Sequence, residues 1–325
     1  MRSCQSKLDV VITVDVEIWC DGWRDLDVRF PDAFRRYIHG PTAAGGYGLP
    51  YQLEVLSGHG LAAVFFVEPL FAARFGLQPL AEIVGIIREA GHEVQLHMHT
   101  EWVDEALEPL LPDIAGKRQH LRHFSRADQA ILIQKGKAML RQAGSGAINA
   151  FRAGSFGFNH DTLHALAANG LQFDSSYNAT LLGPDSGVMP GTLLTDPVHC
   201  SGIDEYPMTV FRDGRRLQHA QLTCCSSAEM EGLLWQAWQQ GRQAFVLLLH
   251  NSELLNRAKT RRDPVVVERF RRLCQFLERH RDSFRTVGFT GRQCSVRGFQ
   301  HGPLSSPFYR TGWRLLEQAY RHKYG

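Results

Sequence analysis

The sequence of 325 residues lacks any run of about 20 apolar residues, so none of its segments is expected to cross a lipid bilayer as a helix. It also lacks a strong charge of either sign: the formal net charge is +3, and the 36 Lys and Arg residues are dispersed. Neither a nucleic acid nor an anionic membrane is therefore indicated as a partner. The densest basic cluster, residues 257–262, is interpreted as a solvated loop from its charge pattern.

Cysteine pairs with the spacing of a metal or redox site are missing as well. The 7 cysteines are an odd number, two of them (Cys224 and Cys225) are adjacent, and no Cys-x-x-Cys occurs. This pattern fits neither a disulfide framework nor a zinc finger, and reduced thiols in a cytosolic protein are the simpler interpretation. The apolar run Leu8–Val14 is too short for a signal-peptide core and ends on acidic residues. We therefore expect a soluble, cytoplasmic protein.

Short apolar runs alternate with helical patterns along the whole chain, as is typical of parallel strands joined by helical crossovers. We expect strands over Leu8–Val14, Ala62–Val67, Glu93–Leu96, Ile148–Arg152, Leu171–Phe173, Ile203–Tyr206, Ala244–Leu249 and Thr286–Phe289. We expect helices over Pro50–Ser57, Pro79–Ala90, Ser125–Ala143, Asp161–Asn169, Ser226–Gln240 and Pro264–His280. A terminal helix over 307–324 is expected to pack on the outside through Trp313, Leu315, Leu316, Ala319 and Tyr320.

This alternation predicts an α/β fold, a distorted (β/α) barrel with seven or eight parallel strands. An open doubly wound sheet is the alternative, although no Gly-x-Gly-x-x-Gly follows a strand. No repeat or linker divides the chain, so we expect one barrel domain over residues 1–325, with a helical extension from about residue 300. Two segments rich in Gly, Pro, Thr and Asp, Ser176–Ser201 and Met208–Cys225, are expected to be loops that face the substrate.

Polar residues that can do chemistry follow separate predicted strands at their carboxyl ends. They are Asp15, Glu17, His97, Arg152, Asp174 and His250. In a barrel these ends meet on one face, where barrel active sites are built. The sequence therefore predicts one catalytic site assembled from several strands.

Two carboxylates leave the first predicted strand. Asp15 and Glu17 stand at positions i and i+2, which share a face of an extended strand, so both can point at the same place. They are costly to bury unless a cation or a hydrogen-bond network holds them. A helix N-cap next to a surface acid is the alternative interpretation.

Histidines and a glutamate cluster after the third predicted strand, in the sequence His97-Met-His99-Thr-Glu101. If the strand continues, His97 and His99 share a face, whereas if a helix begins, His97 and Glu101 do. Either pair suits a divalent metal ion with nitrogen and oxygen ligands. A core histidine is the alternative for each, and His92 is interpreted as part of the turn between helix and strand.

Two further strand ends carry basic side chains. Arg152, buried at a strand end, needs an anionic partner such as Asp15, and a purely structural ion pair remains the alternative to a functional one. His250 ends an apolar strand, a position that suits a general acid as well as a core histidine. Aromatic residues near the strand ends either stack on sugar rings or anchor loops: Trp19, Trp23, Tyr47 and Trp102.

These stretches, in this order, resemble the polysaccharide deacetylases, which are carbohydrate esterase family four. The segment Thr13–Glu17 is similar to the family's Thr-Phe-Asp-Asp motif, Ala63–Val67 to its Ala-Thr-Phe-Phe-Val strand and Gly91–His97 to Gly-His-Glu-Ile-x-x-His. Further along, Arg152–Gly154 looks like Arg-x-Pro, Phe173–Ser176 like the Asp-Ser-Ser segment and Leu249–Asn251 like Leu-His-Asp. The similar stretches extend from residue 8 to about residue 251.

Three positions depart from the family's pattern. Val16 stands where the family has an aspartate metal ligand, so Glu17 would have to reach the ion with its longer side chain. Glu101 stands at the place of the second metal histidine, with His99 as the competing ligand, and Gly154 replaces the proline of the third motif. The chain thus resembles a divergent branch with Asp-x-Glu and His-x-His-x-Glu motifs.

The resemblance implies a metal-dependent hydrolase that removes the acetyl group from an N-acetylated amino sugar of a glycan or glycan precursor. One divalent ion, by resemblance Zn²⁺, would be held by Glu17, by His97 and by either His99 or Glu101. A nucleotide-linked or lipid-linked intermediate of glycan synthesis fits the expected cytoplasmic location.

The resemblance also implies catalytic roles. Asp15 would be the general base, kept ionised by Arg152, and His250 would be the general acid. Asp174 is a candidate both to hold His250 and to bind substrate, and Trp19 and Trp102 are further candidates for substrate binding.

Two alternatives remain open. The same barrel could hydrolyse a C–N amide that is not a sugar acetamide. The departures at Val16, Glu101 and Gly154 also suit a glycan-binding protein that has lost catalysis. A glycoside hydrolase is less favoured, because no second carboxylate can be nominated for the opposite side of a sugar ring. The sequence identifies neither the sugar nor the oligomeric state.

Overall fold

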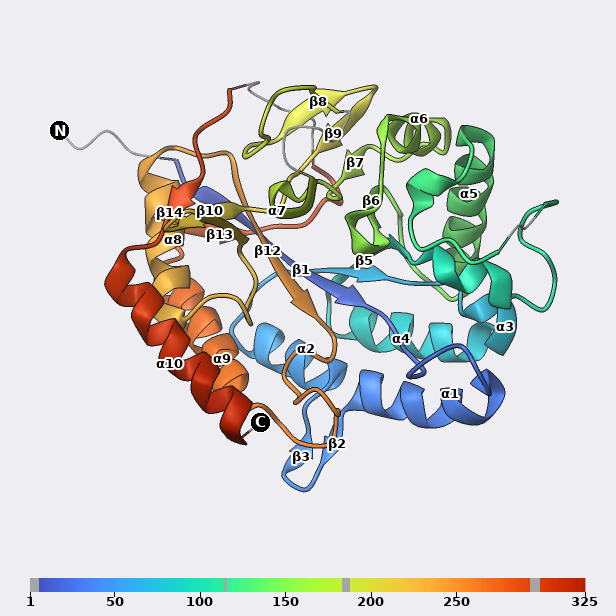
Figure 1. The fold of residues 1–325 in the computed structure, drawn as a ribbon, viewed down its shortest axis with the longest axis horizontal. Helices are drawn as coiled ribbons and strands as arrows, with labels where there is room; N and C mark the ends of the chain where they lie inside the picture. Colours follow the sequence, from blue (N-terminus) through green and yellow to red (C-terminus); the bar gives the residue numbers. More distant parts are fainter. Residues whose placement is uncertain (1–5, 114–115, 183–187, 293–298, 325) are drawn as a thin grey trace. The chain divides into compact units, whose positions relative to one another are not determined.

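The structure of the protein, a computed structural model, describes residues 6–113, 116–182, 188–292 and 299–324. They fall into two units, each assembled from separated parts of the chain. Unit 1 comprises Met1–Ala63, Thr209–Val287 and His301–Gly325, and unit 2 comprises Val64–Met208 and Gly288–Gln300. Figure 1 follows the chain through both units by colour.

Three parallel strands carry the core of unit 1. Strand β1 (Leu8–Val16) pairs in parallel with β12 (Ala244–His250) and with β13 (Phe284–Thr286). The residues of β1 and β12 are almost all apolar and buried, as expected for parallel strands that are covered on both faces. The register aligns Asp15 with His250, so the carboxyl ends of β1 and β12 adjoin.

Two helices of unit 1 begin where side chains cap them. Ser226 forms a capping box with Glu229, and the carboxylate of Asp263 accepts hydrogen bonds from the N–H groups of Val265 and Val266. These caps start α8 and α9 at the positions that the sequence predicts. The helical elements of unit 1 are α1 (Leu26–Phe34), the π-helical turn η1 (Arg35–His39), α2 (Leu49–Gly58), α8 (Ser227–Gln239), α9 (Pro264–Arg279) and α10 (Phe308–Tyr324).

Unit 1 also contains two small antiparallel hairpins. One joins β2 (Pro41–Thr42) to β3 (Gly45–Gly46), and the other joins β10 (Val210–Asp213) to β11 (Arg216–His219), with β14 (Leu304–Ser305) pairing in parallel to β10. The prediction of a plain loop over Met208–Cys225 is therefore wrong in part. The missed signal is Gly214, the first residue of the two-residue turn Gly214-Arg215: it adopts φ +58°, and glycine at this position favours a two-residue hairpin turn.

Unit 2 is built on a sheet with the strand order β4-β5-β6-β7-β9-β8. Its strands are β4 (Val64–Val67), β5 (Glu93–Met98), β6 (Ala150–Ala153), β7 (Phe173–Asp174), β8 (Val198–Cys200) and β9 (Ile203–Glu205). All neighbours are parallel except β8, which runs antiparallel to β9. The intervening helical elements are α3 (Ala72–Phe75), α4 (Leu77–Glu89), α5 (Arg126–Gln142), α6 (His160–Ala168) and α7 (Ala179–Leu182), with 3₁₀ turns η2 (Thr100–Glu105), η3 (Leu121–His123) and η4 (Gly154–Phe156).

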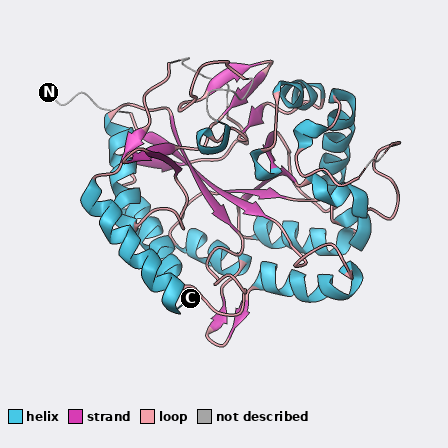
Figure 2. Cartoon of the chain, in the orientation of Figure 1, coloured by secondary structure: helices cyan, strands magenta, loops and turns pink. Residues whose placement is uncertain are grey.

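The predicted helices and most of the predicted strands correspond to elements of the structure, and in both units parallel strands alternate with helices (Figure 2). The strands predicted over Leu171–Phe173 and Thr286–Phe289 share only one residue each with β7 and β13. The α/β class is therefore confirmed. The prediction of a loop over Ser176–Ser201 is wrong in part, because its described residues include α7 and β8; residues 183–187 lie outside the described residues. The prediction of one domain over residues 1–325 stays a prediction.

Helix α1 was not expected from the sequence. Leu26, Phe30 and Ala33 recur at helical spacing and are buried, but Pro31 lies inside the helix, where proline usually ends one. The terminal helix was expected and is present as α10. Its packing was predicted wrongly: Leu315, Leu316 and Ala319 are exposed, while the side chains of Trp313 and Tyr320 lie outside the described part of the chain.

None of the helices in the described residues is both long and apolar enough to cross a membrane. Five cysteines are free thiols in the structure, whereas Cys4 and Cys294 lie outside the described residues.

Candidate active site

The carboxyl ends of β1 and β12 bring an acid and a histidine together in unit 1. Asp15 is aligned with His250 across the two parallel strands, and neighbours in register point to the same face of a sheet. Asp15 is buried, and the main-chain carbonyl of Asp15 accepts a hydrogen bond from the N–H of Asn251. The two predicted catalytic residues of unit 1 are therefore side by side.

The imidazole of His250 lies between two carboxylates. Its Nε2 is 3.7 Å from Oε1 of Glu17, and its Nδ1 is 3.8 Å from Oε2 of Glu253. Burial by itself would lower the pKa of His250, but the contact with Glu253 and the negative charges of Glu17, Glu253 and Asp15 outweigh it and raise the pKa to about 9. In this environment the ring carries a proton at neutral pH.

Glu253 is a partner of His250 that the sequence analysis did not assign. Its carboxylate accepts hydrogen bonds of 2.9 Å from the main-chain N–H groups of His250 and Thr223. Burial would raise the pKa of Glu253, but the interaction with His250 and these hydrogen bonds lower it, so the carboxylate stays ionised. The available signal was its position three residues after His250, in the turn that ends β12.

Asn251 fixes the segment that carries Glu17. The side-chain amide of Asn251 accepts a hydrogen bond from the N–H of Glu17 and donates one to its carbonyl oxygen, both at 3.2 Å. It also donates to the carbonyl oxygen of Tyr37 at 2.8 Å. The amide of buried Gln52 holds the other side of this turn by donating to the carbonyl oxygens of His250 and Asn251.

His97 stands at the end of β5 in unit 2 and has a defined tautomer. Its Nδ1 is 2.9 Å from the carbonyl oxygen of Arg152. Because a carbonyl oxygen only accepts, Nδ1 carries the proton, and the lone pair is on Nε2. This arrangement, in which one ring nitrogen is held by the backbone, is typical of histidine ligands.

His99 follows His97 in extended conformation, so the first of the two sequence alternatives is the one found. The ring centroids of His97 and His99 are 4.8 Å apart with the planes at 81°. Nδ1 of His99 is 3.4 Å from Oε2 of Glu101, which lies in η2. Within unit 2 the histidines are thus neighbours, and Glu101 contacts the second of them.

Gly154 makes room for the ring of His99. A Cβ atom at position 154 would lie 2.7 Å from Cγ and from Nδ1 of His99, and 2.7 Å from the carbonyl oxygen of Met98. Only glycine therefore fits beside this histidine without movement of the strand or the ring.

Glu68, at the end of β4, is a second residue that the sequence analysis missed. Its buried carboxylate accepts hydrogen bonds from the main-chain N–H groups of Leu70 and His99, so it holds the backbone at His99 in place. Burial raises the pKa of this carboxyl to about 8, although the charge on His99 and the two hydrogen bonds oppose the shift. The Glu68-Pro69 step directly after an apolar strand was the only signal.

Arg152 is fully buried at the end of β6. Its Nε donates to the carbonyl oxygen of Ser175 at 2.9 Å, its Nη2 donates to Oγ of Ser175 at 3.0 Å, and its guanidinium carbon lies 4.4 Å from the centre of the Phe66 ring. These contacts fix the direction of the side chain. Whether it acts on Asp15 stays a prediction.

Asp174 pairs with an acid that was not predicted, Glu205. The two are aligned across β7 and β9, both are fully buried, and burial raises the pKa of both carboxyls. Two such groups in contact cannot both ionise at little cost, so the pair shares a proton. Ser176 donates to Oδ1 of Asp174 at 2.5 Å. The predicted roles of Asp174 toward His250 and toward substrate stay predictions.

The aromatic candidates differ in exposure. Trp102 is 1% exposed and packs edge-on against Phe71 and Phe75, which favours the alternative of a loop-anchoring ring over a sugar-stacking one. Trp19 is partly exposed and contacts Trp23 edge-on, with ring centroids 5.9 Å apart. Trp19 therefore has exposed ring surface on which a sugar ring can stack.

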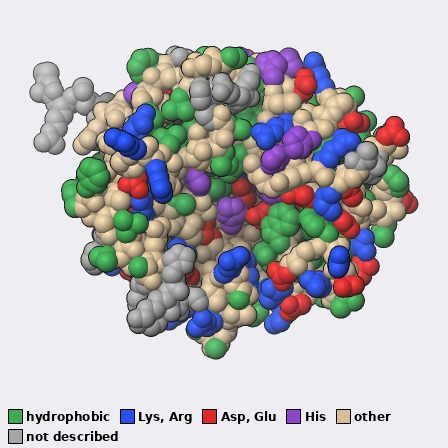
Figure 3. Space-filling view, in the orientation of Figure 1, with side chains coloured by type: hydrophobic (Ala, Val, Ile, Leu, Met, Phe, Trp, Pro, Cys, Tyr) green, Lys and Arg blue, Asp and Glu red, His purple; other side chains and the backbone are tan. Residues whose placement is uncertain are grey.

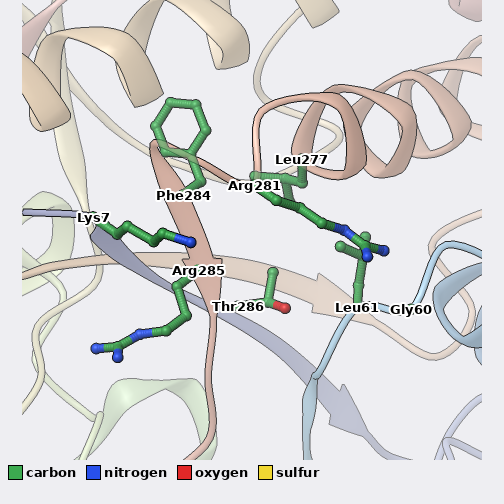
Figure 4. Close-up of a pocket in the computed structure, with 8 residues that line it drawn as sticks. All are labelled: Lys7, Gly60, Leu61, Leu277, Arg281, Phe284, Arg285 and Thr286. Carbon is green, nitrogen blue, oxygen red and sulfur yellow. The ribbon is translucent and has the colours of Figure 1, made fainter.

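A cavity of about 220 Å³ in unit 1 lies away from these residues (Figure 4). It is lined by Lys7, Gly60, Leu61, Leu277, Arg281, Phe284, Arg285 and Thr286. It opens at the amino end of β1, about 25 Å along the strand from Asp15. Two of its cations are engaged, Arg285 with Asp9 at 2.6 Å and Arg281 with the carbonyl oxygen of His59. Because the cavity lies at the opposite end of β1 from Asp15, it is not part of the candidate site.

No family model matches the chain, and no curated protein matches it. Solved structures do. A putative polysaccharide deacetylase from Mycobacterium smegmatis is 18% identical, with 89% of this chain and 96% of that chain covered and a TM-score of 0.50. A family 4 carbohydrate esterase from Streptomyces lividans is 14% identical, with 89% and 97% covered and a TM-score of 0.43. A wild-type family 4 pseudoenzyme from Bacillus anthracis is 14% identical, with 87% and 64% covered and a TM-score of 0.42.

At these identities the likeness shows the fold alone. The likeness to the Mycobacterium smegmatis protein confirms the predicted fold class, an α/β fold of the distorted (β/α)-barrel type. The resemblance to polysaccharide deacetylases that the sequence motifs indicate is thus matched by the fold.

Proposed function

We propose that the protein belongs to the polysaccharide deacetylases and is a metal-dependent hydrolase that removes the N-acetyl group from an amino sugar of a glycan or glycan precursor. One observation carries the proposal: Asp15 and His250 are neighbours at the ends of β1 and β12, with the imidazole between the carboxylates of Glu17 and Glu253. Hydrolysis of an amide needs a base for the attacking water and an acid for the departing nitrogen. A carboxylate beside a protonated imidazole supplies both.

The proposed ligands of the metal ion are Glu17, His97 and His99. The fit of these residues to a divalent ion is supported by the fixed tautomer of His97, whose Nε2 keeps its lone pair, and by the turn at Asn251 that fixes the backbone of Glu17. Two imidazoles and a carboxylate are the donor set that Zn²⁺ favours at catalytic sites.

Between the two candidates for the third ligand, the contacts favour His99. Its ring adjoins His97, and Nδ1 of His99 faces the Glu101 carboxylate at 3.4 Å. A carboxylate behind a histidine is the usual way in which a ligand's second nitrogen is oriented. We therefore assign Glu101 to orienting His99 rather than to the ion.

Four side chains would carry the proton transfers and the charge balance. A divalent ion, when bound, supplies Lewis acidity toward the acetamide carbonyl and toward water. Asp15 takes the proton of the attacking water, and Arg152 keeps Asp15 ionised. His250 donates its proton to the amine nitrogen as the C–N bond breaks, and Glu253 keeps the imidazole protonated until that moment.

The proposed substrate class, an N-acetylated sugar, draws on the aromatic side chain of Trp19. Trp19 is partly exposed and can present apolar surface to a sugar ring, and Asp174 remains a candidate for a polar contact with it. A nucleotide-linked or lipid-linked intermediate agrees with the cytoplasmic location that we predict from the sequence.

The test combines metal analysis with release of acetate from N-acetylhexosamine oligomers. We expect about one equivalent of a divalent ion, its loss in His97→Ala and its retention in the control His92→Ala, because His92 belongs to the turn before β5. Asp15→Asn should keep the ion and lower kcat by about 10²–10⁴.

Each alternative has its own outcome in this test. If His97→Ala loses the ion but Asp15→Asn keeps activity near that of the wild type, the metal site stands and Asp15 is removed from the mechanism. Activity on non-sugar amides but none on N-acetylhexosamines would replace the deacetylase with another amide hydrolase. Absence of metal after reconstitution would leave a glycan-binding protein.

A further inference from the structure

Helix α10 is attached to the rest of unit 1 through its charged side. Arg314, which is buried, pairs with Asp213 and lies 3.3 Å from Oε1 of Glu229. Two more ion pairs extend along the helix: Arg321 with Asp263 at 2.6 Å, and Glu317 with Arg269 at 2.5 Å. The polar face of this amphipathic helix therefore packs inward.

The apolar residues of α10 face outward. Phe308 is 83% exposed, Tyr309 73%, Leu315 55% and Leu316 65%. Together with exposed Gly312 and Ala319, they recur at the spacing of one helix face and form a single stripe, here called the apolar stripe. Figure 3 shows hydrophobic side chains at the surface over α10. An ordinary surface helix has the opposite arrangement, with its apolar face against the core.

Unpaired arginines border the apolar stripe. Arg212, Arg215 and Arg216 of the β10–β11 hairpin are exposed, and none of them forms an ion pair with a described residue. Asp213 does not neutralise them, because it is paired with Arg314. The hairpin lies beside the start of the helix, since a Cβ on Gly214 would come within 4.0 Å of the Phe308 ring.

A second copy of the chain is a poor occupant of this face. An aromatic side chain buries about 150–250 Å² and a leucine less, so at these exposures the four large apolar side chains offer roughly 500 Å². A stable dimer needs about 800 Å² from each partner. The apolar stripe alone therefore falls short of that area.

We propose that the apolar stripe and the hairpin arginines form a docking surface for an anionic lipid bilayer, with α10 lying in the plane of the headgroup region. Aromatic and leucine side chains beside basic residues are the composition of helices that bind at this interface. Phosphate-bearing headgroups supply the negative charge that the arginines lack within the protein. This inference does not depend on the proposed function. The net charge of the chain does not reveal the surface, because the three arginines of one hairpin are a small share of the 36 basic residues in an otherwise balanced sequence.

The test is flotation of the full chain with vesicles of phosphatidylcholine, with and without about 30% phosphatidylglycerol, at an ionic strength of about 0.1 M. We expect binding to the anionic vesicles. The double variant Leu315→Ser, Leu316→Ser should weaken this binding at least about tenfold, because it removes two leucine side chains that the bilayer would bury. The control Leu107→Ser, at a leucine that is 72% exposed in unit 2, should leave it unchanged.

The charges are tested by the double variant Arg215→Ser, Arg216→Ser. Each arginine near an anionic surface changes the affinity by about fivefold, so this variant should bind the anionic vesicles about thirtyfold more weakly. Thermal unfolding of each variant checks that it is folded; the substituted side chains are all exposed.

Three results would overturn the proposal. The first is that the wild type does not float with anionic vesicles, and the second is that both double variants float as well as the wild type does. Alternatively, light scattering finds a wild-type dimer that Leu315→Ser, Leu316→Ser converts to a monomer, in which case the apolar stripe is an interface between copies.

Discussion

Replacing Gly154 by alanine tests whether the space for the His99 ring is as tight as the structure indicates. The added Cβ would lie 2.7 Å from two ring atoms of His99 and 2.7 Å from the carbonyl oxygen of Met98. Carbon atoms in contact are normally about 3.5–4.0 Å apart, so the neighbours would have to move by roughly an ångström. The Met98 carbonyl belongs to β5, and a movement there disturbs the pairing with β6.

The size of the effect of Gly154→Ala depends on which neighbouring atoms move. Overpacking of this kind costs about 1–3 kcal/mol of unfolding free energy. If the His99 ring turns away instead, the strand is spared, but a proposed metal ligand loses its orientation, and a loss of orientation of this kind typically costs about 10–100-fold in metal affinity. Gly154→Ala should therefore lower the stability of the metal-free protein, the affinity for Zn²⁺, or both.

Urea unfolding of the metal-free protein and competition with a Zn²⁺ chelator measure the two effects separately. The matched control is Gly85→Ala in α4, where a Cβ meets nothing within 4 Å and alanine should stabilise the helix by about 0.5–1 kcal/mol. A Gly154→Ala protein whose stability lies within about 0.5 kcal/mol of the wild type and whose Zn²⁺ affinity is unchanged would refute the reasoning.

Asn251→Ala should destabilise the protein by about 2–4 kcal/mol in urea unfolding, because it removes the hydrogen bonds to the part-buried main-chain groups of Glu17 and to the buried carbonyl oxygen of Tyr37; a loss below about 1 kcal/mol would contradict this. Glu253→Gln should lower the pKa of His250 from about 9, since it removes an adjacent negative charge; an unchanged titration of the ring by NMR in the metal-free protein would exclude Glu253 as the cause. The raised pKa values of the Asp174–Glu205 pair mean that its contribution to stability is fully present below about pH 4 and is lost as the pH rises through the folded pKa. Glu205→Gln should therefore flatten the decline of unfolding free energy as the pH rises above the ordinary carboxyl pKa, by up to about 1.4 kcal/mol per pH unit, and equal slopes in both proteins would count against a shared proton.

Much of the fold could be predicted because its signals are local. Apolar runs of the right length, the serine caps at Ser125 and Ser226, and glycines after helices determine where elements begin and end. The convergence of Asp15 and His250 on one face was predicted from the rule that the carboxyl ends of barrel strands meet there. Their direct pairing across β1 and β12 was not predicted, because it depends on which strands are neighbours.

The acids that support the site could not be predicted in the same way. Glu68, Glu205 and Glu253 owe their importance to partners supplied by other parts of the chain: the N–H of His99, the carboxyl of Asp174 and the N–H of Thr223. The orientation of α10 is a similar case. Its leucines predicted a packing face, but ion partners on the β10–β11 hairpin, α8 and α9 hold the charged face instead.

The departures from the deacetylase pattern are physically connected rather than independent losses. Val16 is buried at the end of β1 and offers no ligand, and Glu17 directly after it supplies a second carboxylate near the end of the strand. The other two departures depend on each other. A proline at position 154 would carry a Cβ where the His99 ring lies, so a histidine can occupy that space only when residue 154 is glycine. A site that had merely decayed would have no reason to pair the new histidine with the glycine that admits it. We expect that Gly154→Pro and His99→Ala each abolish metal binding at the proposed centre, whereas Glu101→Gln only weakens it.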